Sequence, residues 1–228
     1  MTYIIGGNEV LHKPTPKVGR EGDRYQGFSP GSTILQAGHR KDPSLRAFEV
    51  DTIFERDIEV PLRDGTILRA DVFRPHNDTK LPALMSWSPY GKSGSGMLNL
   101  SFMPGHAGLS SDALSGYERS SKRQILLSSE EGKDEYDAVE YIAQLPWCTG
   151  SVGIVGNSWL AMAPYHIASQ QPPHLKCFAP LEGASDLHRE THCRSGIPQV
   201  AFASAIAAGF SGRGQTEDLA AMLQKYPD

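Results

Sequence analysis

Ser158 is the residue whose setting best suits covalent chemistry. It follows the short apolar run Val152-Gly-Ile-Val155, and a helical pattern from Leu160 to Ser169 begins just after it. A serine between a buried strand and a helix is presented at the carboxyl edge of the sheet, beside the N–H groups of the first helical turn. Such N–H groups stabilise the oxyanion of an attacked carbonyl by about 2.7–4 kcal/mol each. The pattern predicts Ser158 as a nucleophile and the Trp159 backbone N–H as an oxyanion donor.

The sequence around Ser158 also has a simpler structural explanation. The string Gly156-Asn-Ser-Trp-Leu-Ala161 departs from the G-x-S-x-G motif, because Leu160 stands at the fifth position and the small residue comes one later. Serine is among the preferred N-cap residues of helices, so a capping role explains Ser158 equally well. Pro164 falls inside the expected helix, where proline costs on the order of 3 kcal/mol, so we expect a kink there.

The elements around this turn alternate as they do in a parallel α/β sheet. A β-hairpin is predicted over residues 58–72, because apolar residues alternate with polar ones on both sides of Asp64-Gly65. The other expected elements are a buried strand over 81–88, an amphipathic helix from Glu130 to a stop at Pro146, a strand over 152–155, a helix over 160–169 and a short strand over 175–179. Helix, strand, turn, helix and strand in this order favour a parallel sheet with flanking helices.

The composition excludes several classes of protein. The chain has 228 residues, 39% of them hydrophobic, and a formal net charge of -4, which suits a globular core and disfavours nucleic acid and anionic membranes as partners. No apolar run approaches the roughly 18 residues of a membrane span. The first residues lack the basic and apolar regions of a secretory signal, so a cytoplasmic location is expected. Residues 1–50, rich in Gly, Pro and basic residues without periodicity, are expected to form an N-terminal arm on a domain over 51–228.

The cysteines and acids give no sign of a cofactor. Cys148, Cys177 and Cys193 match no zinc-binding spacing, and the odd number leaves one unpaired in any disulfide scheme, so reduced thiols are predicted. The histidines and carboxylates show no metal-ligand spacing either. The sequence therefore predicts no metal and no cofactor.

Several strings together resemble the CocE/NonD α/β-hydrolases, the group of cocaine esterase and X-Pro dipeptidyl-peptidase. The hairpin string from Asp64 to Pro75 is similar to the family's D-G-x-x-L-x-x-D-V-x-R-P, and Gly156 to Ala161 resembles its G-x-S-Y-x-G turn. The other similar strings are Ser88 to Lys92 (P-Y-x-K), Glu131 to Tyr141 (E-G-x-D-x-Y-D-x-x-E-W), Pro146 to Gly153 (P-W-C-x-G-x-V-G) and Pro172 to Lys176 (P-P-H-L-K). The resemblance covers residues 50–205 and implies an α/β-hydrolase fold.

The resemblance implies a role for three residues. Ser158 resembles the nucleophile that accepts the acyl group, and the Trp159 backbone N–H resembles one half of the oxyanion hole. Tyr90 resembles the tyrosine whose hydroxyl forms the other half, although a half-buried loop aromatic with a satisfied hydroxyl is the commoner fate of tyrosine. The implied activity is cleavage of small ester or amide substrates, X-Pro peptides among them, without a cofactor.

The sequence departs from the family pattern in two places. The family carries a strand and turn of the form R-G-Y-x-V-V-x-x-D-x-R-G between the P-Y-x-K loop and the E-G-x-D helix, and residues 110–129 do not reproduce it. A serine also needs a base and an orienting acid, and Asp186, His188 and His192 stand too close together in sequence to lie on separate loops. A surface turn is expected there instead. We therefore predict an incomplete α/β-hydrolase fold that lacks an internal strand and its C-terminal part, including the acid and histidine of the triad.

Two other functions remain open from the sequence. The first is a catalytically inactive, truncated form of the hydrolase, whose exposed sheet edges would favour self-association. The second is a parallel α/β enzyme that binds phosphate at the Gly153 to Gly156 turn. Neither the G-x-x-x-x-G-K-[ST] nor the G-x-G-x-x-G motif occurs in the sequence, which disfavours phosphate binding.

Overall fold

The computed structural model describes residues 3–5, 7–11, 28–40, 43, 45–88, 115–116, 129–201 and 219–226. Its contacts divide the chain into two compact units. The larger unit spans residues 23–183, and the smaller unit joins residues 1–22 to residues 184–228. The predicted boundary at residue 50 is not tested by this division.

The smaller unit brings segments from both ends of the sequence together. Strands β1 (Tyr3–Ile5) and β2 (Asn8–Val10) form an antiparallel pair, and helix α4 spans Leu219–Lys225. The Glu9 backbone N–H donates to the Tyr226 hydroxyl at 3.0 Å, and Lys225 Nζ lies 3.1 Å from Glu9 Oε2. The rest of this unit includes a short π-helix, His188–His192, and the paired strands β11 (Cys193–Arg194) and β12 (Ile197–Pro198).

The larger unit contains an antiparallel sheet of strands β3 (Gly31–Leu35), β4 (Thr52–Pro61) and β5 (Ile67–Pro75), in that order. The predicted hairpin joins β4 to β5. Its tight turn is closed by the Leu62 N–H donating to Thr66 O at 2.8 Å, and Gly65 takes the positive φ of 84° that the turn requires. Strand β3, although it precedes residue 50, pairs with β4 along its whole length.

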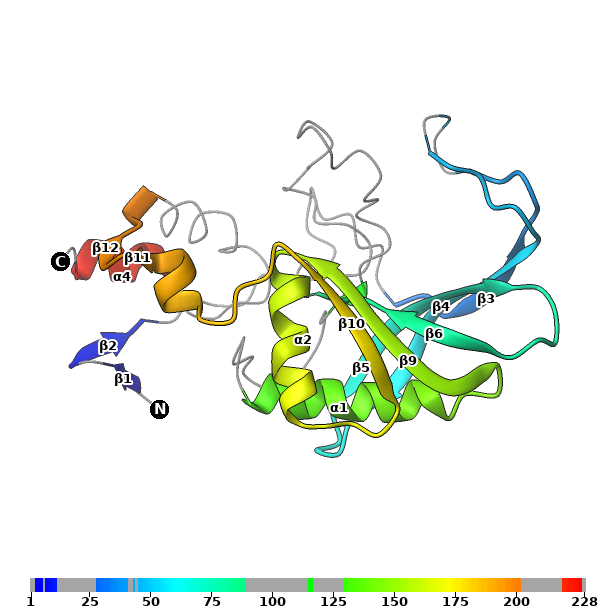
Figure 1. Ribbon diagram of the computed structural model, residues 1–228, viewed down its shortest axis with the longest axis horizontal. Coiled ribbons are helices and arrows are strands. Elements are labelled where there is room, and N and C mark those ends of the chain that lie inside the picture. Colours follow the sequence, from blue (N-terminus) through cyan, green and yellow to red (C-terminus); the bar gives the residue numbers. More distant parts are fainter. Residues whose placement is uncertain are drawn as a thin grey trace. The chain divides into compact units, whose positions relative to one another are not determined.

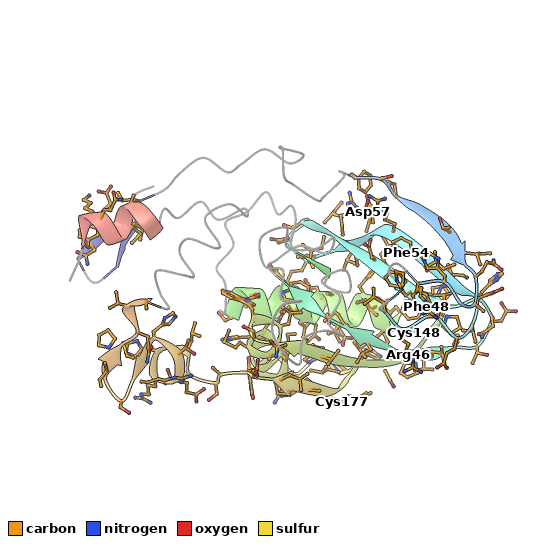
Figure 2. The ribbon with its side chains drawn as sticks, turned by 90° about the horizontal axis from the view of Figure 1, so that it is seen from above. Arg46, Phe48, Phe54, Asp57, Cys148 and Cys177 are labelled. Atoms are coloured by element: carbon orange, nitrogen blue, oxygen red, sulfur yellow. The ribbon has the colours of Figure 1, made fainter. Side chains whose placement is uncertain are left out.

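A β-bulge interrupts strand β4 at Asp57. Glu55 pairs with Val72 and Ile58 pairs with Ala70, so Arg56 and Asp57 together oppose Asp71. Asp57 has a φ of 55° and is only 1% exposed (Figure 2). Its N–H donates to Asp71 Oδ1 at 2.9 Å, and its Oδ2 accepts the Ser29 N–H at 2.7 Å. The bulge is therefore held by hydrogen bonds to the neighbouring strand and to the segment before β3.

A parallel sheet positions the Ser158 turn. It consists of β6 (Leu81–Met85), β9 (Cys148–Asn157) and β10 (Leu175–Leu181) in the order β10-β9-β6. Helices α1 (Ser129–Ala143) and α2 (Trp159–Ser169) cover one face of this sheet (Figure 1). Their contact is close, because a Cβ on Gly132 would lie 2.7 Å from the backbone oxygen of His166.

The core lies between the two helices and the two sheets. Its buried side chains are Val60, Leu62, Leu68, Ala83, Met85, Trp87, Ala138, Val139, Ala143, Cys148, Val152, Ile154, Ala163 and Ile167. On β6, Ala83 and Met85 are buried, whereas Leu84 between them is 72% exposed. The helices therefore cover one face of the parallel sheet, and the opposite face at β6 carries an exposed leucine. This arrangement confirms the predicted α/β class.

The region where a strand was predicted to be missing holds a very short one. Strand β8 consists only of Ser115–Gly116 and pairs in parallel with β7, Trp87–Ser88. The predicted buried strand over 81–88 is thus split at Ser86 into β6 and β7. Within the described residues, the antiparallel and parallel sheets remain separate, and no longer strand joins them.

Candidate active site

The candidate site is the turn between strand β9 and helix α2. Asn157 is the last residue of β9, Trp159 is the first residue of α2, and Ser158 alone makes the connection. The strand is longer than the predicted 152–155, whereas the helix agrees with the prediction to within one residue. Pro164 lies inside α2 and is buried. Ser158 is thus presented at the carboxyl end of a central parallel strand, where ligands of α/β proteins commonly bind.

Ser158 has a strained backbone and an exposed side chain. Its φ is 59° and its ψ is -117°, a conformation that costs a non-glycine residue on the order of 1–3 kcal/mol. Its carbonyl accepts the N–H groups of Ala161 at 2.9 Å and Met162 at 3.1 Å. Although Ser158 occupies the N-cap position, its side chain makes no capping hydrogen bond. The capping explanation therefore lacks the hydrogen bond that would define it.

Close packing behind the turn makes a glycine necessary at position 156. A Cβ on Gly156 would lie 2.2 Å from the Cβ of Leu160 and 2.5 Å from its backbone oxygen. The small residue that the motif shows one place late is Ala161, which is fully buried, and a Cβ on Gly183 would lie 3.3 Å from its Cβ. The departure from G-x-S-x-G at Leu160 is thus compatible with the sharp turn, since Gly156 and Ala161 provide the small residues that the turn needs.

The predicted oxyanion groups are only partly within the described residues. Trp159 occupies the first position of α2, and N–H groups in the first turn of an α-helix have no acceptor within the helix. This position suits the predicted donor, whose role stays a prediction. Tyr90, the other predicted oxyanion group, lies outside the described residues.

The histidines of the larger unit form no hydrogen bond with the Ser158 hydroxyl in the part of the chain that the structure describes. His174 belongs to the connection between α2 and β10, and its Nδ1 lies 2.7 Å from Glu140 Oε2 on α1. His166 lies on α2, where burial lowers the pKa of its imidazole. The site as described therefore contains a presented hydroxyl without a base.

Asp186, His188 and His192 belong to the smaller unit. Asp186 Oδ1 accepts the Arg189 N–H at 2.9 Å, and the Asp186 carbonyl accepts the Glu190 N–H at 2.8 Å. Glu190 in turn accepts the Ser185 N–H and hydroxyl, at 2.9 and 3.0 Å. These contacts make Asp186 part of a local turn that begins the π-helix, as the sequence predicted.

The described residues offer few other groups that could carry out chemistry. They contain no cluster of three or more His, Cys, Asp or Glu side chains that could hold a metal ion. No described helix is long and apolar enough to cross a membrane. All three cysteines are free; Cys148 is buried, whereas Cys177 is exposed on β10 (Figure 2).

Two acidic residues of the larger unit were not singled out from the sequence. Glu182, directly after β10, accepts a hydrogen bond from the Asn157 amide at 2.9 Å. Glu135 on α1 is fully buried, and both of its carboxylate oxygens lack a hydrogen bond. The pKa of Glu135 is raised well above its ordinary value, mainly by burial and to a smaller extent by the negative charges of Glu131 and Asp134. The spacing of Glu131 and Glu135 with Val139 along one helix face could have indicated that these acids point inward.

Comparison with known families settles the relationship of the chain. The profile of the X-Pro dipeptidyl-peptidase family (S15 family) matches residues 64–225. The chain belongs to this family. The resemblance inferred from the sequence strings is therefore confirmed, and the S15 match includes the Ser158 turn and both covering helices.

Individual known proteins are also similar to this chain. Cocaine esterase from Rhodococcus sp. (strain MB1 Bresler) is 29% identical over 140 residues, which is 58% of this chain and 24% of that protein. Two crystal structures of a CocE/NonD family hydrolase from Staphylococcus aureus are 26% and 28% identical, with TM-scores of 0.66 and 0.68. An α-amino acid ester hydrolase, at 18% identity and a TM-score of 0.52, shares the fold.

The chain spans less than half of the length of these relatives. The match covers 96% of this S15 chain and 42% of the Staphylococcus aureus hydrolase. The similarity therefore establishes an α/β-hydrolase fold over the part that carries the strand-turn-helix and leaves the activity of the whole protein to be tested.

Proposed function

We propose that this chain carries the nucleophile of a serine hydrolase that cleaves small esters or amides through an acyl-enzyme on Ser158. The observation that carries the proposal is the strained, exposed backbone of Ser158 between β9 and α2, with a side chain that caps nothing. A conformation of this kind persists only where the surrounding structure imposes it, and such strain is frequent at catalytic residues. Membership of the S15 family supports the same role.

The proposed reaction has two stages. The Ser158 Oγ forms a bond to the substrate carbonyl carbon while its proton passes to a base, and the alcohol or amine then departs with a proton. Water subsequently attacks the acyl-enzyme and releases the acid. In both stages the Trp159 N–H and the Tyr90 hydroxyl are proposed to donate to the oxyanion, each contributing about 2.7–4 kcal/mol.

Serine needs a general base for the first stage, and a third group must orient that base. No described histidine of the larger unit forms a hydrogen bond with the Ser158 hydroxyl. The proposed mechanism therefore requires an acid and a histidine beyond those that the structure describes near the turn. A catalytically inactive form is the alternative, and it follows directly if no such residues reach Ser158.

Labelling with a fluorophosphonate probe tests the proposal. The probe forms a covalent bond with an activated serine hydroxyl, so wild-type protein is expected to be labelled and Ser158→Ala is expected to lose the label completely. Ser169→Ala serves as the matched control, because Ser169 ends the same helix and donates to the His166 carbonyl. Absence of labelling in a folded wild-type sample would overturn the proposal and support the inactive alternative.

Turnover measurements would then assign the class of substrate. An activated acetate ester and an X-Pro anilide represent the two substrate classes suggested by the names of the family and of the cocaine esterase relative. Hydrolysis of either that disappears in Ser158→Ala would support an acyl-enzyme mechanism. Labelling without turnover of either substrate would leave the nucleophile supported and the substrate class wrong.

A further inference from the structure

Three successive residues, from the last residue of β10 onward, contact the Ser158 turn. The Ser158 N–H donates to the Leu181 carbonyl at 3.0 Å. The Asn157 side-chain amide donates to Glu182 Oε2 at 2.9 Å, and a Cβ on Gly183 would lie 3.2 Å from the backbone oxygen of Ala161. The turn is therefore fixed from the neighbouring strand as well as by its own helix.

Glu182, like Ser158, is a non-glycine residue with a positive φ. Asn157 and Leu181 are the last paired residues of β9 and β10, and the residues that follow them, Ser158 and Glu182, have φ values of 59° and 56°. Each is a non-glycine residue in the left-handed region, which carries a cost for a side chain that has a Cβ. Two strained residues thus leave the sheet side by side, and the contact between Asn157 and Glu182 joins them.

We propose that Glu182 is a positioning residue for Ser158. Its carboxylate accepts the Asn157 amide, which is adjacent to Ser158 in the chain, and thereby fixes the direction in which the turn presents the serine hydroxyl. This inference rests on the proposed nucleophilic role of Ser158.

The contact is solvent-exposed, and exposed hydrogen bonds and ion pairs contribute little to global stability. Its expected effect is therefore on the geometry of the turn and on the rate of reaction at Ser158. Misplacement of a reacting group by a fraction of an ångström to one ångström lowers rates strongly, whereas the unfolding temperature hardly changes. This difference separates a positioning role from a structural one.

Two variants of Glu182 test the role. Glu182→Gly removes the carboxylate and also relieves the left-handed strain, since glycine adopts positive φ without a steric cost. It is expected to unfold close to the wild-type temperature yet to react with the fluorophosphonate probe about tenfold more slowly. Glu182→Gln keeps a carbonyl acceptor for Asn157, so its labelling rate is expected to remain within about twofold of wild type.

Glu49→Ala is the matched control, because Glu49 is an exposed glutamate that pairs with Arg46 on the segment before β4. Hydrogen exchange over residues 155–162 provides a readout that needs no activity. The Ser158 amide is expected to exchange faster in Glu182→Gly than in wild type, Glu182→Gln or Glu49→Ala. The same order of exchange and labelling would support the proposal.

The outcomes distinguish this inference from the proposed function. If wild-type protein is not labelled but the exchange differences are found, the nucleophilic role fails and the positioning contact stands. If wild type is labelled and Glu182→Gly matches it in labelling and exchange, the positioning role is overturned. Equal slowing by Glu182→Gln and Glu182→Gly would also overturn it, because the acceptor geometry would then not be what matters.

Discussion

Gly156 lies so close to Leu160 that a Cβ on the glycine would meet the Leu160 Cβ at 2.2 Å. The same Cβ would lie 2.5 Å from the backbone oxygen of Leu160 and 2.7 Å from its carbonyl carbon. Because these are backbone atoms, no change of side-chain rotamer would relieve the clash. The last part of β9 and the first turn of α2 therefore fold back on each other more tightly than any residue other than glycine permits. This contact fixes the sharpness of the Ser158 turn.

Replacement of this glycine should be costly. Gly156→Ala is expected to lower the free energy of unfolding by about 1–3 kcal/mol or more, because backbone atoms of Leu160 have to move. Gly31→Ala is the control, since a Cβ there meets nothing within 4 Å and its φ is not positive. Urea unfolding of both variants checks the expectation. Equal midpoints for the two variants would contradict the tight packing at the turn.

The buried carboxyl of Glu135 should make stability fall as pH rises. Folding raises its pKa, so between pH 4.5, its ordinary pKa, and its higher folded value the native state binds more protons than the unfolded state. Stability from this group is therefore greatest in acid and is lost with increasing pH. Glu135→Gln is expected to flatten this dependence and to be more stable than wild type at pH 8. Urea unfolding from pH 4 to 8 measures it, with the half-exposed Glu59→Gln as control.

If the pH dependence of Glu135→Gln equals that of wild type, the carboxyl has a partner in solution that keeps it charged. In either case, the free energy of unfolding of Glu59→Gln is expected to vary with pH as that of wild type does. The ion pair of Glu59 with Arg69 is largely solvent-accessible on the Glu59 side. The two variants thus differ in that Glu135→Gln replaces a buried carboxyl group and Glu59→Gln replaces an exposed one.

Arg63 connects the end of the hairpin strand to helix α1. Its Nη2 lies 2.6 Å from Asp137 Oδ1, and its backbone N–H donates to Asp137 Oδ2 at 2.7 Å; the side-chain hydrogen bond to Asp137 raises the Arg63 pKa. Arg63→Ala is expected to cost only about 0.5–1 kcal/mol, because the guanidinium is half-exposed. Asp137→Ala should cost more, since it also removes the backbone acceptor. Thermal unfolding of both variants tests this order, and the reverse order would contradict it.

The two faces of the parallel sheet should respond differently to truncation. Ile154 is 1% exposed beneath the helices, so Ile154→Ala is expected to cost about 2–5 kcal/mol through lost burial and a residual cavity. Leu84, on the opposite face of neighbouring β6, is 72% exposed, and Leu84→Ala should stay within about 0.5 kcal/mol. Chemical denaturation distinguishes these values. A large cost at Leu84 would mean that something covers that face in solution.

The sequence pattern was sufficient where alternation and turn chemistry agree. Val60, Leu62 and Leu68 are buried on one side of the predicted hairpin, and Gly65 makes its turn. The order of helix, strand, turn and helix around Ser158 likewise follows from short apolar runs with strong boundaries. Each of these features depends on residues that are close together in the sequence, so the pattern of a single sequence predicts them.

Other features depend on contacts that no local pattern encodes. Strand β3 exists because β4 offers it a partner, and its mostly exposed residues show no apolar face. The Asn157–Glu182 contact joins residues 25 apart in sequence and depends on the register of β9 and β10. Whether the Ser158 turn is catalytic was left equally open by its residue types, because a cap and a nucleophile occupy the same position. The backbone angles of Ser158 distinguish the two geometries, and labelling distinguishes the two roles.

The bulge at Asp57 gives the two parts of β4 opposite phases of alternation. Ile53 and Glu55 share a face with Ile58 and Val60, although their odd and even numbers would place them on opposite faces of a regular strand. A deletion of this single buried residue would leave Arg56 alone opposite Asp71 in a regular ladder, so Phe54 would stay opposite Phe73 and both parts of the strand would keep their present faces. Asp57 is thus an inserted residue that the strand accommodates without a change of register on either side, and its loss is expected to act through the hydrogen bonds to Asp71 and Ser29 rather than through mispairing of the strands.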